Sequence, residues 1–385
     1  MDIIWNGDHF FHLTKSHACV DRYIVLGLHE LGHNVRVTNI MDNKLFDSNN
    51  KDHRLIKSFT KKTFTSDYNL YKYPAIDHMK AGPKFNCLLH GDGSYVISIR
   101  EANIIANHSV THYLLPTPDQ AVAVDKLIPT PVYSPGVDGG VNPDIFNLDV
   151  EPYELSSLDS RIGKDTFVFF LACDGARNTP GRPWGGYRGT DIGIAAFVKE
   201  FSNKDDVCLI LKVAGQAGFV GKYVELLYKY DMPLIVHDFK NDPQNVVAQK
   251  MAASNCMLNP IRDCRWEMMC LESMACGTPC IATRCGGPKV YGRKGIFFVE
   301  PVVSDGDLVR SRGDTPIGRD IWTEPTVDGF QKMMRYAYEN RDEVKRVGID
   351  GNENVMANWK WIDMSKRLVR FFETGKSFNP NTLDK

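Results

Sequence analysis

Two series of short apolar runs, each alternating with helical stretches, constrain the fold of this chain most strongly. The first series starts at Asp2 and ends near Ser134, and the second starts with the almost continuous apolar run Thr166–Cys173. Such a run is typical of a strand that is buried on both faces of a parallel sheet, because crossover helices cover those faces. The alternation therefore predicts an α/β chain with two doubly wound parallel-sheet domains.

A polar, irregular stretch that begins after Pro143 and ends near Lys164 separates the two series. We place the boundary within it, so that residues 1–150 form the first domain and residues 151–359 the second. In doubly wound sheets a ligand binds outside the carboxyl ends of the strands. The binding site is therefore expected in a central cleft between the two domains.

The composition is that of an ordinary folded protein. Of 385 residues, 43% are apolar, and 46 Lys and Arg nearly balance 47 Asp and Glu, which gives a formal net charge of −1. These values exclude long disorder and argue against a protein that coats nucleic acid. The chain holds no apolar run of the ~20 residues that a membrane span needs, and its first residues lack the pattern of a signal peptide.

Ten cysteines occur, and five of them lie between Cys264 and Cys285. None of these five forms a C-x2-C pair, the spacing with which one turn binds zinc, so packing of reduced thiols is the favoured interpretation. Reduced cysteines without a signal peptide predict a cytoplasmic protein, or one in the host cytoplasm if the chain is viral. No metal or cofactor site is predicted.

The most informative stretch runs from Arg262 to Pro288. It is typical of a loop, a helix, a Gly-Thr-Pro turn, a buried strand and a glycine pair. Glu272 falls within the helix, where its carboxylate can accept two hydrogen bonds from a ribose diol. Gly286 and Gly287 present backbone N–H groups that can approach an anion closely.

This stretch resembles the donor-site signature of retaining GT-B glycosyltransferases of group 1, the glycogen-synthase-like family with two glutamates in an E-x7-E arrangement. Three further segments resemble the same family, in the family's order: Ser134–Phe146, Arg188–Asp191 and Trp322–Trp361. The resemblance covers about residues 134–372 and implies a GT-B fold, with two Rossmann-like domains facing a central cleft. It also implies that the C-terminal segment, residues 360–385, carries a helix that crosses back to the N-terminal domain.

By the same resemblance, the chain is expected to move a hexose or pentose from a nucleoside diphosphate sugar to a hydroxyl acceptor. Retention of configuration, no metal and no cofactor are implied, and the leaving phosphate would accept the proton of the acceptor. The acceptor, bound by the first domain, would be a glycan, a glycoprotein or a modified DNA base. Cations and backbone N–H groups aimed at the diphosphate would stabilise the charge that develops there.

Four cations are candidates for binding the diphosphate. Arg188 stands where the family has a lysine, and it can bind phosphate through a two-pronged fork. Arg177 is the preferred second cation, in competition with Arg182 in the same loop. Lys212, at the carboxyl end of a strand, is a secondary candidate.

The first domain offers two candidates beside the expected cleft. Ser16 and His17 begin a helix whose N-terminus suits a phosphate or the acceptor. His90 follows the strand Phe85–Leu89 and is expected to point into the cleft, although a lone histidine at a strand end is more often structural.

The sugar end of the signature departs from the family. Cys264 stands where the family has the first of its two glutamates, and Asp263 and Glu267 can supply a carboxylate from either side. This change beside an intact nucleotide end favours an unusual donor sugar. A catalytically silent protein that still binds nucleotide sugars is the alternative.

The segment His29–His33 matches the H-E-x-x-H pattern of zinc metallopeptidases. Their chemistry needs both imidazoles on one face of an unbroken helix. Gly32 interrupts the helical pattern, and a strand is expected from Asn34. A metallopeptidase is therefore the least favoured interpretation.

Residues 51–84 are basic, with eight Lys or Arg against three Asp. Five aromatics are interleaved with them: Phe59, Phe64, Tyr68, Tyr71 and Tyr73. Cations that hold a phosphate backbone and rings that stack on bases would suit a phage-type transferase that glycosylates hydroxymethylated DNA bases. The other interpretation, which we favour, is a solvated loop with a few core aromatics.

Overall fold

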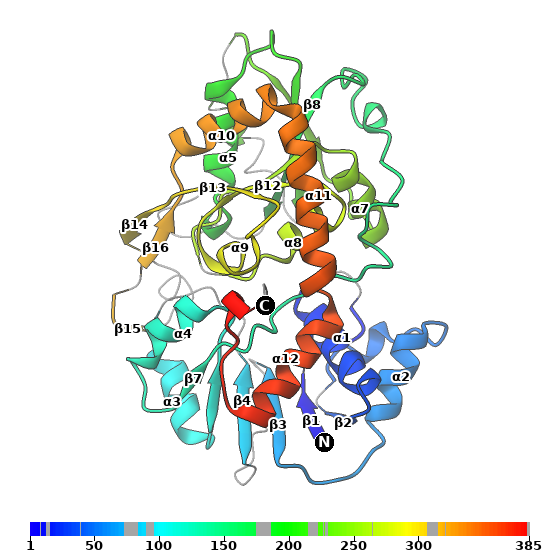
Figure 1. Ribbon diagram of the computed structural model, residues 1–385, viewed down its shortest axis with the longest axis vertical. Helices are drawn as coiled ribbons and strands as arrows, with labels where there is room; N and C mark the ends of the chain where they lie inside the picture. The colour runs from blue at the N-terminus through cyan, green and yellow to red at the C-terminus, as the bar shows by residue number, and fades with distance from the viewer. Residues whose placement is uncertain are drawn as a thin grey trace.

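The computed structural model has two lobes, each built around one six-stranded sheet (Figure 1). The structure describes residues 1–7, 9–12, 16–38, 40–72, 84–89, 96–174, 186–214, 222–225, 227, 230–263, 265–305, 315–319 and 321–382. Every strand pair within the two large sheets is parallel, which confirms the doubly wound α/β class predicted from the apolar runs.

The first lobe has the strand order β2-β1-β3-β4-β6-β7. Its strands are β1 (Asp2–Asn6), β2 (Asn34–Thr38), β3 (Tyr68–Lys72), β4 (Phe85–Leu89), β6 (His112–Leu114) and β7 (Val132–Tyr133). Its helices are α1 (Ser16–Glu30), α2 (Lys51–Phe59), α3 (Ile99–Asn107) and α4 (Pro118–Asp125). Strand β4 is buried at every residue, as a central strand covered on both faces must be.

The second lobe has the strand order β10-β9-β8-β11-β12-β13. Its strands are β8 (Phe167–Asp174), β9 (Val207–Ala214), β10 (Leu234–Asp238), β11 (Cys256–Asn259), β12 (Cys280–Thr283) and β13 (Ile296–Val299). Its helices are α5 (Thr190–Glu200), α7 (Gln244–Ala252), α8 (Met268–Ala275), α9 (Gly286–Tyr291), α10 (Val327–Glu339) and α11 (Arg341–Asn358). The nine described cysteines are all buried and free, consistent with packing.

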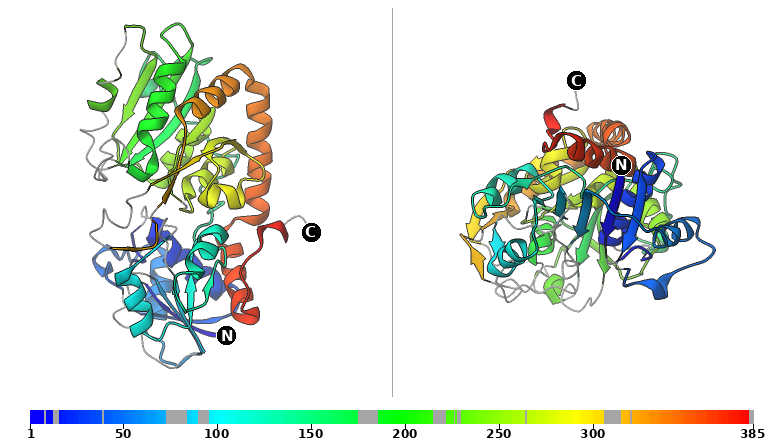
Figure 2. Two further views of the ribbon diagram at one scale, coloured as in Figure 1. Left: turned by 90° about the vertical axis from the view of Figure 1, so that its left-hand side faces the viewer. Right: turned by 90° about the horizontal axis from the view of Figure 1, so that it is seen from below.

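Helix α12 (Trp361–Thr374) continues from α11 into the first lobe, where it packs against α1 (Figures 1 and 2). The contact is close, because a Cβ at Gly27 of α1 would lie 2.3 Å from the hydroxyl of Ser365. Ser365 also donates to the backbone oxygen of Ile24. The C-terminal helix therefore joins the two lobes on one side of the molecule.

A second connection spans the lobes through β14 (Val302–Asp305), β15 (Pro316–Ile317) and β16 (Ile321–Glu324), which we call the interdomain strap. Strands β14 and β16 pair antiparallel beside the second lobe. Strand β15 instead pairs with β5 (Ile97–Ser98) of the first lobe. Figure 1 labels β15 beside that lobe. Ile317 packs there against the apolar cluster that contains Ile97 and Val124. The sequence pattern did not predict this strap.

Candidate functional site

The loop between β11 and α8 lies against the segment that joins the lobes, residues 134–146, which we call the joining segment. Trp266 in this loop donates from Nε1 to the backbone oxygen of Gly139, 2.8 Å away. Gly139 has no space for a side chain, since a Cβ there would lie 2.5 Å from the Trp266 ring. The loop that carries the sequence signature is therefore fixed at the boundary between the lobes, where the site was predicted.

Glu267 follows Trp266 and has a left-handed backbone with φ of +53°, which L residues rarely adopt. Its carboxylate Oε2 lies 3.1 Å from Nη1 of Arg188, the residue just before the turn into α5. The hydroxyl of Tyr291 donates to the Glu267 backbone oxygen at 2.7 Å. Strained backbone held by its surroundings is concentrated at functional sites, so this pair marks the centre of the candidate site.

The buried side chain of Arg262 forms hydrogen bonds with several segments that surround the Arg188–Glu267 pair. Its two terminal nitrogens donate to the two carboxylate oxygens of Asp191, each at 2.7 Å, and Nε donates to Glu324 at 2.7 Å. Nη1 also donates to the backbone oxygen of Gly186. One guanidinium thus connects the start of α5, the turn that carries Arg188 and the base of the interdomain strap. The sequence pattern gives no signal for this role of Arg262, because its partners lie far away in the chain.

Glu272 lies in α8 with 9% of its surface exposed. Its carboxylate makes no hydrogen bond or ion pair with any residue that the structure describes, and burial raises its pKa to about 7. Burial, and to a smaller extent the carboxylate of Glu272, raise the pKa of Cys19 on α1 of the opposite lobe. A buried carboxylate without donors is costly, so this position is suited to a ligand that brings hydroxyl groups.

Asp263 is also buried, but it has partners. Its carboxylate accepts from the backbone N–H of Arg265 at 3.1 Å and from the Arg265 guanidinium. Burial raises the pKa of Asp263 to about 6, although Arg265 opposes this shift. Asp263 is therefore positioned beside Glu267, but part of its hydrogen-bonding capacity is already used.

Gly287 of the glycine pair is required for close packing against the backbone of Trp266. A Cβ at Gly287 would lie 2.0 Å from the backbone oxygen of Trp266, so no other residue fits there. The Gly287 N–H donates to the backbone oxygen of Arg265 at 2.8 Å. The expectation that this N–H is available to a phosphate is therefore corrected, while Gly286 begins α9 with a left-handed φ of +55°.

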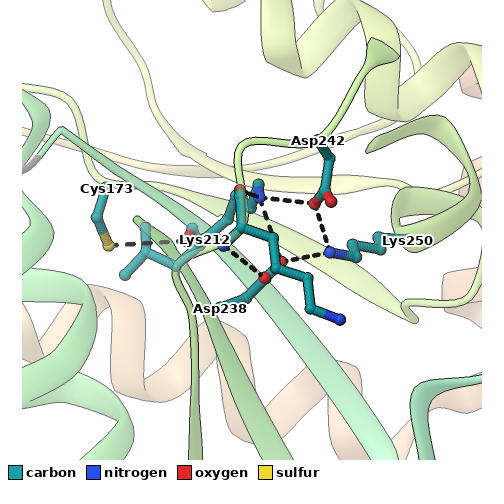
Figure 3. A network of polar contacts seen from close by, with 7 residues as sticks. Cys173, Lys212, Asp238, Asp242 and Lys250 are labelled. Carbon is teal, nitrogen blue, oxygen red and sulfur yellow. Dashed lines mark hydrogen bonds and ion pairs between the residues drawn. The ribbon is translucent and has the colours of Figure 1, made fainter. Parts of the chain in front are cut away.

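Lys212 belongs to a four-charge network at the carboxyl ends of β9 and β10 (Figure 3). Its ammonium lies 2.7 Å from Asp242 and 3.4 Å from Asp238. Lys250 of α7, which is fully buried, lies 2.6 Å from Asp238 and 2.5 Å from Asp242. The two lysines and two aspartates neutralise each other, so Lys212 already has two anionic partners that a donor phosphate would have to displace.

A buried polar cluster of the first lobe was missed by the sequence analysis. Lys72, at the carboxyl end of β3, lies 3.6 Å from Asp21 of α1, which also accepts from the indole of Trp5 at 2.8 Å. The carboxylate of Asp138, in the segment that joins the lobes, raises the pKa of Lys72, and its Oδ2 has no hydrogen-bond partner among the described residues. Burial raises the pKa of Asp138 to about 7 and lowers that of Lys72.

Lys72 of this cluster and Glu272 both shift the pKa of the Cys19 thiol on α1. The charge of Lys72 lowers the pKa of Cys19, and the charge of Glu272 raises it, while burial is the largest influence. Lys72 comes from the first lobe and Glu272 from the second. The two lobes therefore present polar groups of opposite charge to a common region.

Several predicted site residues, or their side chains, lie outside the part of the chain that the structure describes. Cys264, Arg177, Arg182 and His90 lie outside the described residues. Ser16 does begin α1, with His17 as the next residue, but their side chains also lie outside the described part of the chain.

The metallopeptidase interpretation does not agree with the helix that it requires. Helix α1 ends at Glu30, and Gly32 has a φ of +82°. His29 packs against the ring of Phe59, while His33 Nδ1 contacts the N-terminal amine at 3.1 Å. The two imidazoles therefore do not share a helix face, as zinc binding by this motif needs.

Within the basic segment 51–84, residues 51–59 form α2, residues 68–72 form β3, and residues 60–67 between them form neither helix nor strand. Phe59 is 1% exposed and Tyr71 is 3% exposed, and both belong to apolar clusters. Tyr68 stacks on Phe85 and contacts Phe372. Phe59 and Tyr71 are therefore core residues that offer no ring face to bases, whereas Phe64 and Tyr68 are partly exposed. Tyr73 lies outside the described residues. The favoured interpretation of a solvated loop is wrong for residues 51–59 and 68–72, although its core aromatics are present.

Comparison with known proteins agrees with this arrangement. Residues 180–308 match the family described as glycosyl transferases group 1, and no curated protein matches the sequence. The whole chain is similar in structure to a glycosyltransferase from Rickettsia africae, with a TM-score of 0.60 and 12% identity over 97% of each chain.

Two further solved structures share the architecture. Sucrose-phosphate synthase from Thermosynechococcus elongatus has a TM-score of 0.57 and 14% identity, over 97% of this chain and 98% of that one. Anabaena HepE in complex with UDP-glucose has a TM-score of 0.56 and 12% identity, over 97% of this chain and all of that one.

The fold is therefore GT-B, with two Rossmann-like lobes. The segment that matches glycosyl transferases group 1, residues 180–308, contains Arg188, Glu267, Glu272 and the glycine pair. Among the described residues, no helix has both the length and the apolar character to cross a bilayer.

Proposed function

We propose that the chain binds a nucleoside diphosphate sugar at the second lobe and transfers the sugar, with retention of configuration, to a hydroxyl acceptor. The observation that carries this proposal is the buried carboxylate of Glu272, which has no partner among the described residues and lies on α8, the helix that follows Glu267. An α-helix rises 1.5 Å per residue, so residues 267 and 272 are about 7.5 Å apart along its axis. This spacing suits the ribose and the sugar-diphosphate end of one donor.

Each group has a chemical role in that arrangement. Glu272 accepts hydrogen bonds from the ribose diol, and Arg188 binds the diphosphate oxygens on which negative charge develops. The bond between the anomeric carbon and the phosphate oxygen breaks, and a bond to the acceptor oxygen forms on the same face. The leaving phosphate takes the acceptor proton. Arginine supplies the positive charge in this scheme, so no metal is required.

Glu267 is a positioning residue for Arg188. Its carboxylate orients the guanidinium, and its rigid left-handed backbone fixes the start of α8. With Cys264 at the first glutamate position, Glu267 and Asp263 are the carboxylates closest in sequence to the expected sugar. The nucleotide-sugar assignment is supported by the Anabaena protein, whose solved complexes contain UDP and UDP-glucose.

The acceptor is proposed to bind beside Lys72 and Asp138. No described residue donates to the Asp138 Oδ2, and Lys72 lies at the carboxyl end of β3. A hydroxyl group can donate to a carboxylate and accept from an ammonium at the same time. The pair therefore suits a sugar with adjacent hydroxyl groups, and a glycan is the favoured acceptor class.

Thermal shift with a panel of nucleoside diphosphates and nucleotide sugars tests the donor assignment, since a ligand of the folded state raises its apparent stability. We expect one sugar nucleotide to raise the melting temperature, and slow hydrolysis of that donor with EDTA present. Binding without any turnover would instead support the catalytically silent alternative. No stabilisation by any member of the panel would contradict the proposal.

A further inference from the structure

The C-terminal tail folds back over the segment that joins the lobes. The Phe378 N–H donates to the backbone oxygen of Ser134 at 2.8 Å, and the Ser134 N–H donates to the Ser377 hydroxyl at 3.1 Å. A cavity of about 520 Å³ lies between α12, this tail and Pro135. Its volume falls within the range of about 300–1,000 Å³ that small-molecule sites occupy.

The cavity is strongly basic. Lys366, Arg367, Arg370 and Lys376 line it, and Asp363 is the acidic residue among its lining side chains. Asp363 already accepts from the Lys360 N–H at 3.1 Å and lies 3.8 Å from Lys366. Arg370 and Lys376 are exposed and form no ion pair with any described residue. Four cations therefore face one carboxylate.

Arg367 is the most constrained of these cations. Its guanidinium lies between the rings of Trp359 and Phe378, 4.1 and 4.2 Å from their centroids. It donates to the backbone oxygen of Asn358 at 2.6 Å and to that of Gly136 at 3.4 Å, but to no carboxylate in the described chain. Burial lowers the pKa of Arg367 to about 10, although Asp363 opposes the shift. A half-buried cation with neutral partners gains from an anion beside it.

We propose that this cavity is a binding site for a small phosphorylated molecule, with the phosphate held by Arg367, Arg370 and Lys376. A guanidinium binds phosphate through two parallel hydrogen bonds, and an ammonium adds a point charge. The ligand fills a cavity between a helix and a tail, which favours a free small molecule over a lipid headgroup in a flat membrane.

Such a ligand contacts the parts of the chain that connect the lobes. Arg367 and Arg370 belong to α12, Lys376 belongs to the tail, and the tail is bonded to Ser134 in the joining segment. Binding therefore stabilises one arrangement of α12 and the joining segment. The site is distinct from Glu272 and Arg188, so its occupancy does not depend on the proposed donor.

The test uses the full chain with inorganic pyrophosphate as the probe, measured by calorimetry and by hydrogen–deuterium exchange. UDP is present throughout, so that any nucleotide site is filled. We expect slower exchange in peptides from residues 357–379. The double variant Arg370→Glu/Lys376→Glu should weaken pyrophosphate binding by about tenfold or more, since each contact is a charge-assisted hydrogen bond.

The control is Lys332→Glu/Lys345→Glu, which changes two exposed cations on α10 and α11 and alters the net charge equally. Equal weakening in both double variants, no change in either, or no pyrophosphate binding at all would overturn the proposal. Sedimentation with phosphatidylglycerol vesicles tests whether the anion is a lipid headgroup. If the protein binds these vesicles through Arg370 and Lys376 but does not bind pyrophosphate, the proposal of a free small molecule is overturned. Both residues are exposed, and Arg370→Gln/Lys376→Gln repeats the measurement if the first variant unfolds.

Discussion

The guanidinium of Arg188 and the carboxylate of Glu267 lie 3.1 Å apart, although 79 residues separate them in the chain. The pair joins the turn before α5 to the strained start of α8. Arg262 supports it from behind through Asp191 and the Gly186 backbone. Three segments that are distant in the sequence thus hold one cation at the lobe boundary, where a diphosphate can be bound.

Arg188→Ala should lower kcat more than it raises KM for the donor. Loss of one group that stabilises developing negative charge typically costs about 100- to 1,000-fold in kcat. Arg188→Lys should recover part of this loss, because it restores the charge but not the fork. Steady-state kinetics check the effect, with Arg346→Ala, an exposed residue of α11, as the control. Unchanged turnover in Arg188→Ala would remove Arg188 from the site.

Glu272→Gln should weaken donor binding by at least about tenfold, since charge-assisted hydrogen bonds to the ribose become neutral ones. Calorimetry with the nucleoside diphosphate found in the ligand panel measures this change. Glu339→Gln, on the exposed part of α10, should bind the donor like the wild type. Equal affinity in Glu272→Gln and the wild type would contradict the ribose assignment.

The same substitution should stabilise the free protein above about pH 7. The pKa of Glu272 is about 7 in the folded state and 4.5 without burial, so the unfolded chain loses its proton at lower pH. Folding stability from this group is therefore lost as pH rises from 4.5 to about 7, to a total of about 3 kcal/mol. Glu272→Gln should unfold at a higher temperature than the wild type at pH 8, and at the same temperature at pH 4.

Lys250→Met should destabilise the second lobe by about 3–5 kcal/mol, because it leaves Asp238 and Asp242 with Lys212 as their remaining cation in the network. Lys250 is fully buried, so water cannot replace its ammonium. Urea unfolding measures the loss. Lys199→Met, at an exposed position of α5, should change stability little, and equal effects in the two variants would show that the network is unimportant.

The sequence predicted those parts of the fold that local pattern determines. The apolar run of β8 identified a buried parallel strand because both of its faces are covered. The helix that carries Glu272 and the strand after it were also predicted, and α8 and β12 confirm them. In contrast, β3 lies in a basic segment whose charges obscure the apolar residues Leu70 and Tyr71, and it was not predicted.

The contacts within the candidate site involve residues that are distant in the sequence, and the local sequence pattern does not reveal such neighbours. The left-handed backbone of Glu267 has no sequence signal, since glutamate gives no indication of positive φ. Gly287 was expected to leave its N–H open to an anion, but the approach of the Trp266 backbone explains why a glycine is needed there. Asp138 and Lys72 influence each other electrostatically although they are far apart in the sequence, so local pattern could not reveal their relationship.

Ile317→Asp should release the interdomain strap from the first lobe. The side chain packs against Ile97 and its apolar neighbours, and a buried carboxylate there costs more than the short β15–β5 pairing provides. Because Glu324 at the base of the strap also binds Arg262, release should both widen the range of lobe positions and weaken donor binding. Small-angle scattering should show a larger radius of gyration for Ile317→Asp. Val303→Asp changes an exposed residue of β14 in the same strap and should scatter like the wild type; if Ile317→Asp does so too, the strap does not hold the lobes together.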